Sequence, residues 1–168
     1  MQRLCRIFLI FSLLWPYALH AEGLKTPPKV SDMVDIEADR LDVNTKNGTA
    51  IFKGRVKATK PDITVKGNTL TLVYDQKSHK VNMLTAEGDV DILWKDKEAT
   101  CAKAVYDLVS DVMVMTGDVV ITRGQEKIIG QKVTLDKKND TQVVEGAGRR
   151  VKVRVNAGES TGIMQWGK

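Results

Sequence analysis

The sequence predicts an all-β protein, an elongated antiparallel jelly roll built from repeated two-strand units. Three observations favour it: apolar and polar residues alternate over most of the chain, turn-forming residues recur at regular intervals, and one pattern of glycines occurs four times. Alternation with a period of two, rich in β-branched residues, is typical of half-buried strands. A convincing helical stripe occurs nowhere along the chain.

The first 21 residues have the composition of a secretory signal peptide. Arg3 and Arg6 give a positively charged start, residues 7–14 form an apolar run, and Ala18 and Ala21 supply small residues near a cleavage site. An uncleaved membrane anchor is the alternative, but the apolar run is well short of the roughly 20 residues that a spanning helix needs. We therefore expect cleavage after Ala21 and secretion.

The rest of the chain reads as a leader, one domain and a tail. Residues 22–33 are polar and contain Pro27-Pro28, so we expect an extended leader. The clearest alternating segments are then residues 36–43, 56–58, 63–72, 119–121 and 129–135, and turn-forming residues occupy 47–48, 60–62, 75–78, 95–97, 123–125 and 137–140. This spacing is typical of an antiparallel meander. It predicts one domain over residues 34–155 and a tail over residues 156–168 that is either a disordered end or a cap on the last strand.

An internal repeat underlies the alternation. One set of positions, spaced 29, 34 and 29 residues apart, is Ala38, Gly67, Cys101 and Gly130, and three residues after each come Leu41, Leu70, Ala104 and Val133. A second set, spaced 34, 29 and 29 residues apart, is Gly54, Gly88, Gly117 and Gly146. A two-strand unit cannot bury its apolar face alone, so the copies must share a core. Glycine within a strand marks a bulge or bend, so four bends in phase predict two facing sheets along a shared seam.

Charge and cysteine content narrow the function classes. Cleavage would remove Arg3 and Arg6 and leave 24 lysines and arginines against 21 acidic residues, a formal net charge of +3. A nucleic-acid-binding domain is expected to show a concentrated basic face, which this balance does not call for. Cys5 would leave with the signal peptide, so no internal disulfide is possible. The position of Cys101 in the repeat favours a small buried apolar residue over a reactive thiol.

Enzyme chemistry finds little support, and we expect no catalytic residue, metal or cofactor. His79 would be the only histidine after cleavage and lies in an expected turn, so neither a histidine-based triad nor a multi-histidine zinc site is available. Carboxylates that alternate with apolar residues, as around Glu37 and Asp91, are typical of a solvated sheet face. Gly146 and Gly148 lack the third glycine and the following helix of a dinucleotide-binding loop.

Several segments carry a family resemblance. They are Ile36-Glu-Ala-Asp-Arg-Leu-Asp-Val43 with Ala50-Ile-Phe-Lys-Gly-Arg-Val-Lys-Ala58, and Val105-Tyr-Asp-Leu108 with Met115-Thr-Gly-Asp-Val-Val-Ile121. Over about residues 34–155 the chain resembles the LptA/OstA-like family. The resemblance implies a V-shaped β-jelly roll in the periplasm of a Gram-negative cell. It also implies that the protein binds the acyl chains of lipopolysaccharide and stacks head to tail into a bridge between the membranes.

The resemblance also implies partners. These are LptC-like inner-membrane and LptD-like outer-membrane proteins, which share the fold. LptC-like proteins keep an uncleaved anchor and LptD-like proteins add a large barrel, so we expect the soluble middle component. The terminal strands, near Pro27-Pro28 and near Arg149 and Arg150, are either edges protected by proline and charge or docking edges that accept another strand.

An apolar groove would suffice for such a lipid. The expected inward-facing lining residues are Ile36, Val43, Leu72, Ile92, Leu93, Tyr106, Leu108 and Ile121. The same alternation would serve a closed core equally well, so the groove follows from the resemblance and not from the spacing. The alternative function is a structural β-repeat protein of the periplasm that polymerises through its edges without lipid. A carbohydrate-binding jelly roll is a more distant alternative, because it would be expected to expose aromatic platforms.

Overall fold

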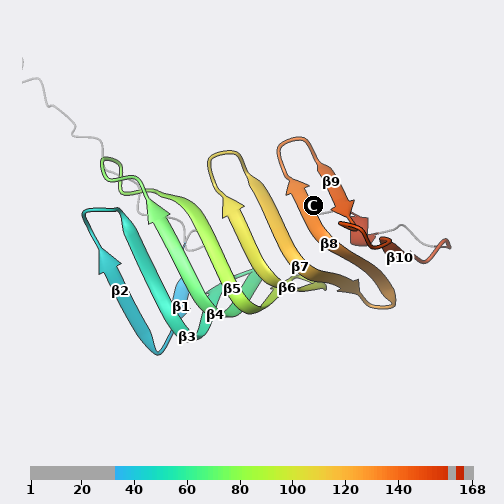
Figure 1. Ribbon diagram of the computed structural model, residues 1–168, viewed down its shortest axis with the longest axis horizontal. Helices are drawn as coiled ribbons and strands as arrows, with labels where there is room; N and C mark the ends of the chain where they lie inside the picture. The colour runs from blue at the N-terminus through green and yellow to red at the C-terminus, as the bar shows by residue number, and fades with distance from the viewer. Residues whose placement is uncertain (1–32, 159–161, 165–168) are drawn as a thin grey trace, which may run out of the picture.

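The computed structural model describes residues 33–158 and 162–164, and these form ten strands and one 3-10 turn (Figure 1). The expected signal peptide and nearly all of the expected leader lie outside the described residues. The elements are β1 (Asp35–Glu37), β2 (Arg40–Asn44), β3 (Thr49–Lys60), β4 (Ile63–Tyr74), β5 (Val81–Trp94), β6 (Lys97–Asp107), β7 (Val112–Arg123), β8 (Glu126–Asp136), β9 (Thr141–Glu145), β10 (Lys152–Arg154) and the turn η2 (Gly162–Met164).

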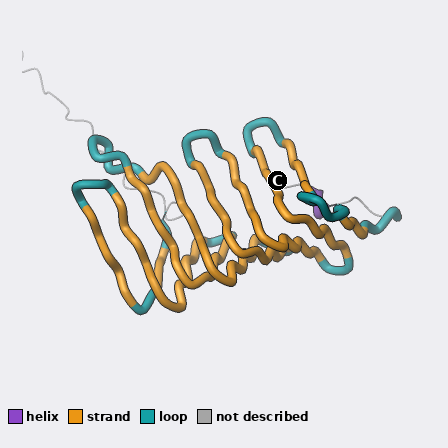
Figure 2. Tube along the Cα trace, viewed as in Figure 1, coloured by secondary structure: helices purple, strands orange, loops and turns teal. Residues whose placement is uncertain are grey.

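The strands form an antiparallel meander that folds over on itself. Each of the long strands from β3 to β8 pairs with the next one along the chain, while β1 and β2 pair with the two ends of β3 and β9 and β10 with the two ends of β8. The long strands therefore run through two facing sheets (Figures 1 and 2). We call these the β2–β9 sheet and the β1–β10 sheet, after the short strands at their ends. The all-β jelly-roll prediction is confirmed.

The seam between the two sheets is a row of β-bulges at the repeated glycines. Gly54, Gly88 and Gly117 have φ angles of 78°, 78° and 84°, and the register between neighbouring strands shifts at each of them. Only glycine adopts such angles without strain. On the partner strands the first repeated set lies at the same level, since Gly67 pairs with Val56 and Gly130 with Val119. These three phased bends are as the repeat predicted.

The fourth glycine differs. At Gly146 there is no bulge within a continuous strand: β9 ends one residue earlier, the Arg149 N–H donates to the Gly146 carbonyl at 2.9 Å, and β10 begins at Lys152. The other end of the sheet is interrupted in the same way, between β1 and β2, where the Asp39 N–H donates to the Gly54 carbonyl at 3.0 Å. The physical reason is that an end strand is hydrogen-bonded to a neighbour on one side only. With less pairing to hold it straight, the chain crosses the seam by a turn and not by a bulge.

Aspartates shape the turns that join strand ends in the β2–β9 sheet, on the side away from the seam. Asp75 Oδ1 accepts the Ser78 N–H at 2.7 Å, Asp107 Oδ1 the Ser110 N–H at 3.1 Å, and Asp136 Oδ1 the Asn139 N–H at 3.0 Å. Such side-chain-to-backbone bonds replace a backbone turn contact. They also hold the pKa of the Asp75 and Asp107 carboxyls below its ordinary value, while the Asn139 side-chain amide, and after it the Asn139 N–H, lowers that of Asp136.

The core lies between the two sheets and is densest near β7 and β8. Met115, Val119 and Ile121 are 0% exposed there, and Ile128 and Leu135 are 1% exposed. Cys101 is also buried, and desolvation raises the pKa of its thiol to about 11. This placement agrees with the interpretation of Cys101 as an apolar packing residue.

The C-terminal turn η2 adds to this core. Ile163 is 0% exposed and belongs to the same apolar cluster. Part of the tail therefore packs against the domain. In the part of the chain that the structure describes, no helix has the length and hydropathy to cross a membrane.

Candidate functional site

The candidate site is the apolar interior between the two sheets. Inward-facing residues of successive strands pair in register, so they form continuous rows. In the β2–β9 sheet one row is Val43, Ala50, Leu72, Leu84, Tyr106, Met113, Leu135 and Gln142, and the next is Leu41, Phe52, Leu70, Ala86, Ala104, Met115, Val133 and Val144. In the β1–β10 sheet the row is Ile36, Ala58, Val65, Ile92, Ala99, Ile121, Ile128 and Val153.

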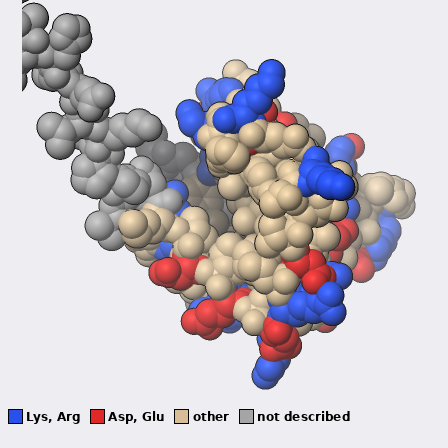
Figure 3. All heavy atoms as spheres, turned by 90° about the vertical axis from the view of Figure 1, so that its left-hand side faces the viewer, with Lys and Arg blue, Asp and Glu red and all other residues tan. Residues whose placement is uncertain are grey.

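Exposure changes along these rows. At the β1–β2 end Val43 is 56% and Leu41 is 51% exposed, and Phe52 and Leu72 are half-buried. Farther along, the exposed fraction falls to 0% at Met115. Figure 3 views the β1–β2 end, where uncharged atoms fill the middle of the face and charged side chains gather around them. The interior is thus a closed core near β7 and β8 and a partly open apolar surface near β1 and β2.

Most of the predicted lining residues lie on the inward rows. Ile36, Val43 and Leu72 occupy the open portion, whereas Ile92 and Ile121, 3% and 0% exposed, lie in the closed core. Tyr106 also lies on an inward row, whereas Leu108 lies in the turn after β6 and Leu93 on the outer face.

Leu93 was predicted to face inward, but the structure places it on the outward face. Its register partners Thr64 and Glu98 are on the outward face, and Leu93 is 49% exposed. The reason lies at the Gly88 bulge, where Gly88 and Asp89 stand opposite one residue of β6, Ala102. Three residues lie between inward Ala86 and inward Val90, so β5 keeps its alternation through the bend. The partner strand β6 changes phase instead, because its inward residues Ala104 and Cys101 have only two residues between them.

Tyr106 and Leu108 lie near the turns of the β2–β9 sheet, on the side away from the seam. Leu108 is in the turn after β6, is 39% exposed, and its N–H donates to the Asn82 carbonyl at 2.9 Å. Tyr106 is half-buried, and its hydroxyl donates to the Asp111 carboxylate. Burial, together with that neighbouring carboxylate, raises the pKa of Tyr106. The tyrosine therefore stays a neutral hydrogen-bonding group at neutral pH.

Lys137 contacts both sheets on the side opposite the seam, where turns join the strand ends. The Lys137 Nζ lies 5.0 Å from the centroid of the Trp94 ring and 4.7 Å from that of the Tyr106 ring. Trp94 ends β5 in the β1–β10 sheet, whereas Tyr106 is on β6 in the β2–β9 sheet and Lys137 is in the turn that follows β8. We call this side of the interior, where the turns of the two sheets face each other opposite the seam, the mouth. Lys137 and Trp94 were not predicted to meet, because they flank turns and lie far apart in the chain.

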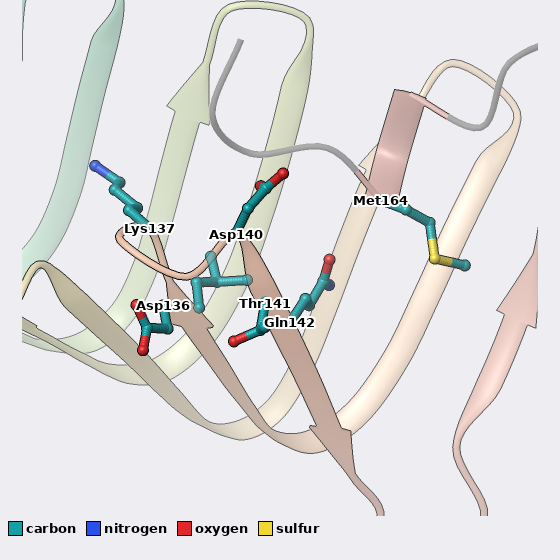
Figure 4. A pocket seen from close by; sticks show the side chains of 7 residues that line it. Asp136, Lys137, Asp140, Thr141, Gln142 and Met164 are labelled. Atoms are coloured by element: carbon teal, nitrogen blue, oxygen red, sulfur yellow. The ribbon is translucent and has the colours of Figure 1, made fainter.

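Next to Lys137, a shallow pocket lies where the β8–β9 turn meets η2 (Figure 4). Seven residues line it, five polar or charged and two apolar: Leu135, Asp136, Lys137, Asp140, Thr141, Gln142 and Met164. Among the described residues, no group of three or more His, Cys, Asp or Glu side chains is arranged to hold a metal ion. The exposed apolar side chains of the inward rows at the β1–β2 end are the stronger candidate for binding a lipid.

Outward-facing carboxylates take part in surface ion pairs. Asp91 pairs with Lys66 at 3.4 Å, Glu87 with Lys103 at 2.9 Å, and Glu145 with Lys132 at 2.7 Å. Ion pairs of this kind on an exposed sheet face contribute little to stability. The alternating carboxylates thus form a solvated face.

Comparison with known proteins gives one family and two relatives. The model of the family described as LptA/(LptD N-terminal domain) LPS transport protein matches residues 35–141. The lipopolysaccharide export system protein LptH of Pseudomonas aeruginosa is 28% identical over 144 residues, covering 83% of this chain and 76% of that protein. An uncharacterised protein of Rhizobium meliloti is 21% identical over 133 residues, covering 73% of this chain and 70% of its own.

The fold has a counterpart among solved structures. The crystal structure of LptH from Pseudomonas aeruginosa, described as the LptA homologous periplasmic component of the lipopolysaccharide transport device, superimposes with a TM-score of 0.65. The two share 18% sequence identity, and the match covers 77% of this chain and 99% of that one. At this identity the likeness concerns the fold, which is the folded-over meander described above.

Proposed function

The chain belongs to the family of LptA and the LptD N-terminal domain, the LPS transport proteins, and from this premise we propose that it binds lipopolysaccharide and carries it from the inner to the outer membrane. It would act as the soluble bridge component of the Lpt system in the periplasm, after export by its N-terminal signal peptide. Such a task contributes to outer-membrane assembly and needs no catalytic step.

The observation that carries the proposal is the partly open apolar surface at the β1–β2 end. Three rows of inward side chains converge there, and Val43, Leu41 and Phe52 remain partly exposed. Shielding an acyl chain from water is worth about 0.8 kcal/mol per buried CH₂. A surface of this kind therefore supplies binding energy without any specific polar contact, and it leaves the sugar headgroup in solvent.

Partners follow from the two ends of the meander. β1 and β2 at one end, and β9 and β10 at the other, each pair with one neighbour in the described residues, so each leaves a strand edge to which another strand can add. Inward residues at both ends are exposed, with Leu41 at 51% and Val153 at 50%. We propose that further copies of this chain, an LptC-like inner-membrane protein and an LptD-like outer-membrane protein cover these ends.

The alternative is a β-repeat protein that polymerises without lipid. It uses the same edges and differs only in leaving the interior empty of lipid. The family is one of LPS transport proteins and LptH is a lipopolysaccharide export protein, and both descriptions favour the lipid carrier.

A matched pair of substitutions tests the lipid site. Leu72 is half-buried on an inward row, whereas its neighbour Thr71 pairs with Ile51 and Thr85 on the outward face. We expect Leu72→Asp to abolish co-purification of lipopolysaccharide with the protein, and Thr71→Asp to leave it unchanged. Equal retention of lipid by both folded variants would contradict the proposed site.

Self-association is tested separately. Light scattering should show the mass of the wild-type protein rising with concentration, and Val43→Asp should weaken that rise because it places a charge on the exposed end of an inward row. A strict monomer at high concentration would contradict the head-to-tail arrangement but not the lipid site.

A further inference from the structure

The contact between Lys137, Trp94 and Tyr106 at the mouth has a chemistry that the apolar rows do not explain. An ammonium lies between two aromatic rings from opposite sheets, at 5.0 Å and 4.7 Å from their centroids. The Lys137 Nζ also donates to the Tyr106 hydroxyl at 3.3 Å and lies 3.9 Å from an Asp111 oxygen. The charge is therefore held at the rim of the apolar interior, on a side chain that is only partly exposed.

Its sequence neighbour behaves differently. The Lys138 Nζ donates to the Val109 carbonyl at 2.7 Å, a contact within the turns of a single sheet. Lys137 is the member of this pair that reaches across the mouth, with a side chain 26% exposed. The two lysines differ in position by one residue and share their chemistry, which makes them a matched pair for experiment.

The contacts of Lys137 are weak enough to be exchanged. A cation–π contact at a partly exposed site and an ion pair near 4 Å each contribute little. The nearby carboxylates of Asp107 and Asp136 are engaged by backbone N–H groups of their own turns, and Asp111 is shared with the Tyr106 hydroxyl. A phosphate group, with more charge and more acceptor oxygens than Asp111, would compete well for this ammonium.

We propose that Lys137 selects lipids with a phosphorylated headgroup, by closing the mouth over Trp94 and Tyr106 when lipid is absent and pairing with a headgroup phosphate when lipid is bound. This inference rests on the proposed lipid-carrier function. When the ammonium turns outward to the phosphate, the faces of the two rings become available to the first carbons of an acyl chain. Charge recognition and entry of the chain are thus coupled at one residue.

The test compares two ligands that share the same acyl chains: lipid A, and lipid A from which the phosphates have been removed. Affinities are measured for the wild-type protein, Lys137→Met, Lys137→Arg and the control Lys138→Met. The wild type and the control should prefer phosphorylated lipid A by about tenfold, the worth of one charge-assisted hydrogen bond. Lys137→Met should remove most of that preference, and Lys137→Arg should retain it.

Trp94 gives a second readout. Trp15 leaves with the expected signal peptide, so substituting Trp166 by Phe leaves Trp94 as the only tryptophan of the exported protein. Lys137→Met should change Trp94 emission without lipid and should abolish the further change that lipid A induces through the departing ammonium. This readout also shows whether each variant is folded around the ring.

The outcomes separate the two proposals. A full preference for phosphorylated lipid A in Lys137→Met would overturn the role of Lys137 and leave the carrier function standing. Equal wild-type affinity for both ligands would overturn phosphate recognition. Failure of the wild-type protein to bind either ligand would instead overturn the carrier function itself.

Discussion

The backbone N–H of Ile163 donates a hydrogen bond to the Glu126 carboxylate at 3.2 Å and so joins the C-terminal turn to the start of β8. The same carboxylate, on a residue only 8% exposed, accepts the Asn156 N–H at 3.4 Å and faces an Arg123 guanidinium nitrogen at 3.7 Å. A buried carboxylate needs such partners to offset its lost hydration. Glu126 is thus the polar anchor that lets Ile163 enter the core.

We predict that Ile163→Ala destabilises the protein by about 2 kcal/mol or more, because it removes buried methyl groups and leaves a cavity. Urea unfolding measures the loss. Met164→Ala is the matched control, since Met164 is 48% exposed, and it should change stability by no more than about 0.5 kcal/mol. Equal effects of the two substitutions would show that the turn does not pack against the domain in solution.

The seam gives a second prediction. A Cβ added at Gly117 would lie 2.6 Å from the Cβ of Ala102, and the φ angle there is 84°. Gly117→Ala therefore combines backbone strain with a clash and should cost about 2 kcal/mol or more. Gly124, in the β7–β8 turn, has a φ of 55° but nothing within 4 Å, so Gly124→Ala should cost only about 1 kcal/mol of strain.

Thermal and urea unfolding of the two glycine variants measure these costs. Similar losses at both positions would mean that strain alone decides, and that the close approach of strands at the seam is not required.

Acid sensitivity gives a third prediction. The N–H groups of Ser110 and Val109, the first foremost, bond to the Asp107 carboxylate and lower its pKa below the ordinary value of 3.8. A carboxyl with a lowered pKa in the folded state stabilises the fold above its unfolded-state pKa, and that stabilisation is lost as pH falls through the folded-state pKa. The free energy of unfolding should therefore decrease as the pH is lowered below about 4.

Asp107→Asn should make this acid-induced fall shallower, because it removes one of the carboxyls that must be protonated. Urea unfolding at a series of pH values between neutral and pH 3 provides the measurement. An unchanged pH dependence in the variant would show that the N–H groups of the turn do not favour the ionised form of Asp107 over the protonated form.

The seam could be predicted from sequence because a steric requirement repeats. Gly54, Gly88 and Gly117 recur in phase with apolar positions, and the φ angles of 78°, 78° and 84° at these positions favour glycine. Side-chain direction beyond a bulge was less accessible. The face of Leu93 depends on how many residues of β5 form the bulge at Gly88, and only the register with β6 gives that number.

Contacts between turns could not be predicted at all. Lys137 and Trp94 meet because the two sheets fold over at the seam, and alternation along a strand does not report which turns then face each other. The tail was similarly ambiguous, since a short apolar segment such as Ile163-Met164 fits a disordered end as well as a cap. The degree of opening between the sheets also depends on packing across the fold, and period-two alternation is the same for a groove and a core.

The central claim is that lipopolysaccharide occupies the interior near β1 and β2, and photo-crosslinking in cells tests it most directly. A benzophenone side chain at Phe52 would face the interior, and at neighbouring Lys53, whose Nζ pairs with Asp42 at 3.1 Å, it would lie on the outer face. We predict lipopolysaccharide adducts at Phe52 and none at Lys53. Adducts to neighbouring proteins alone at Phe52, with no lipid, would contradict the account.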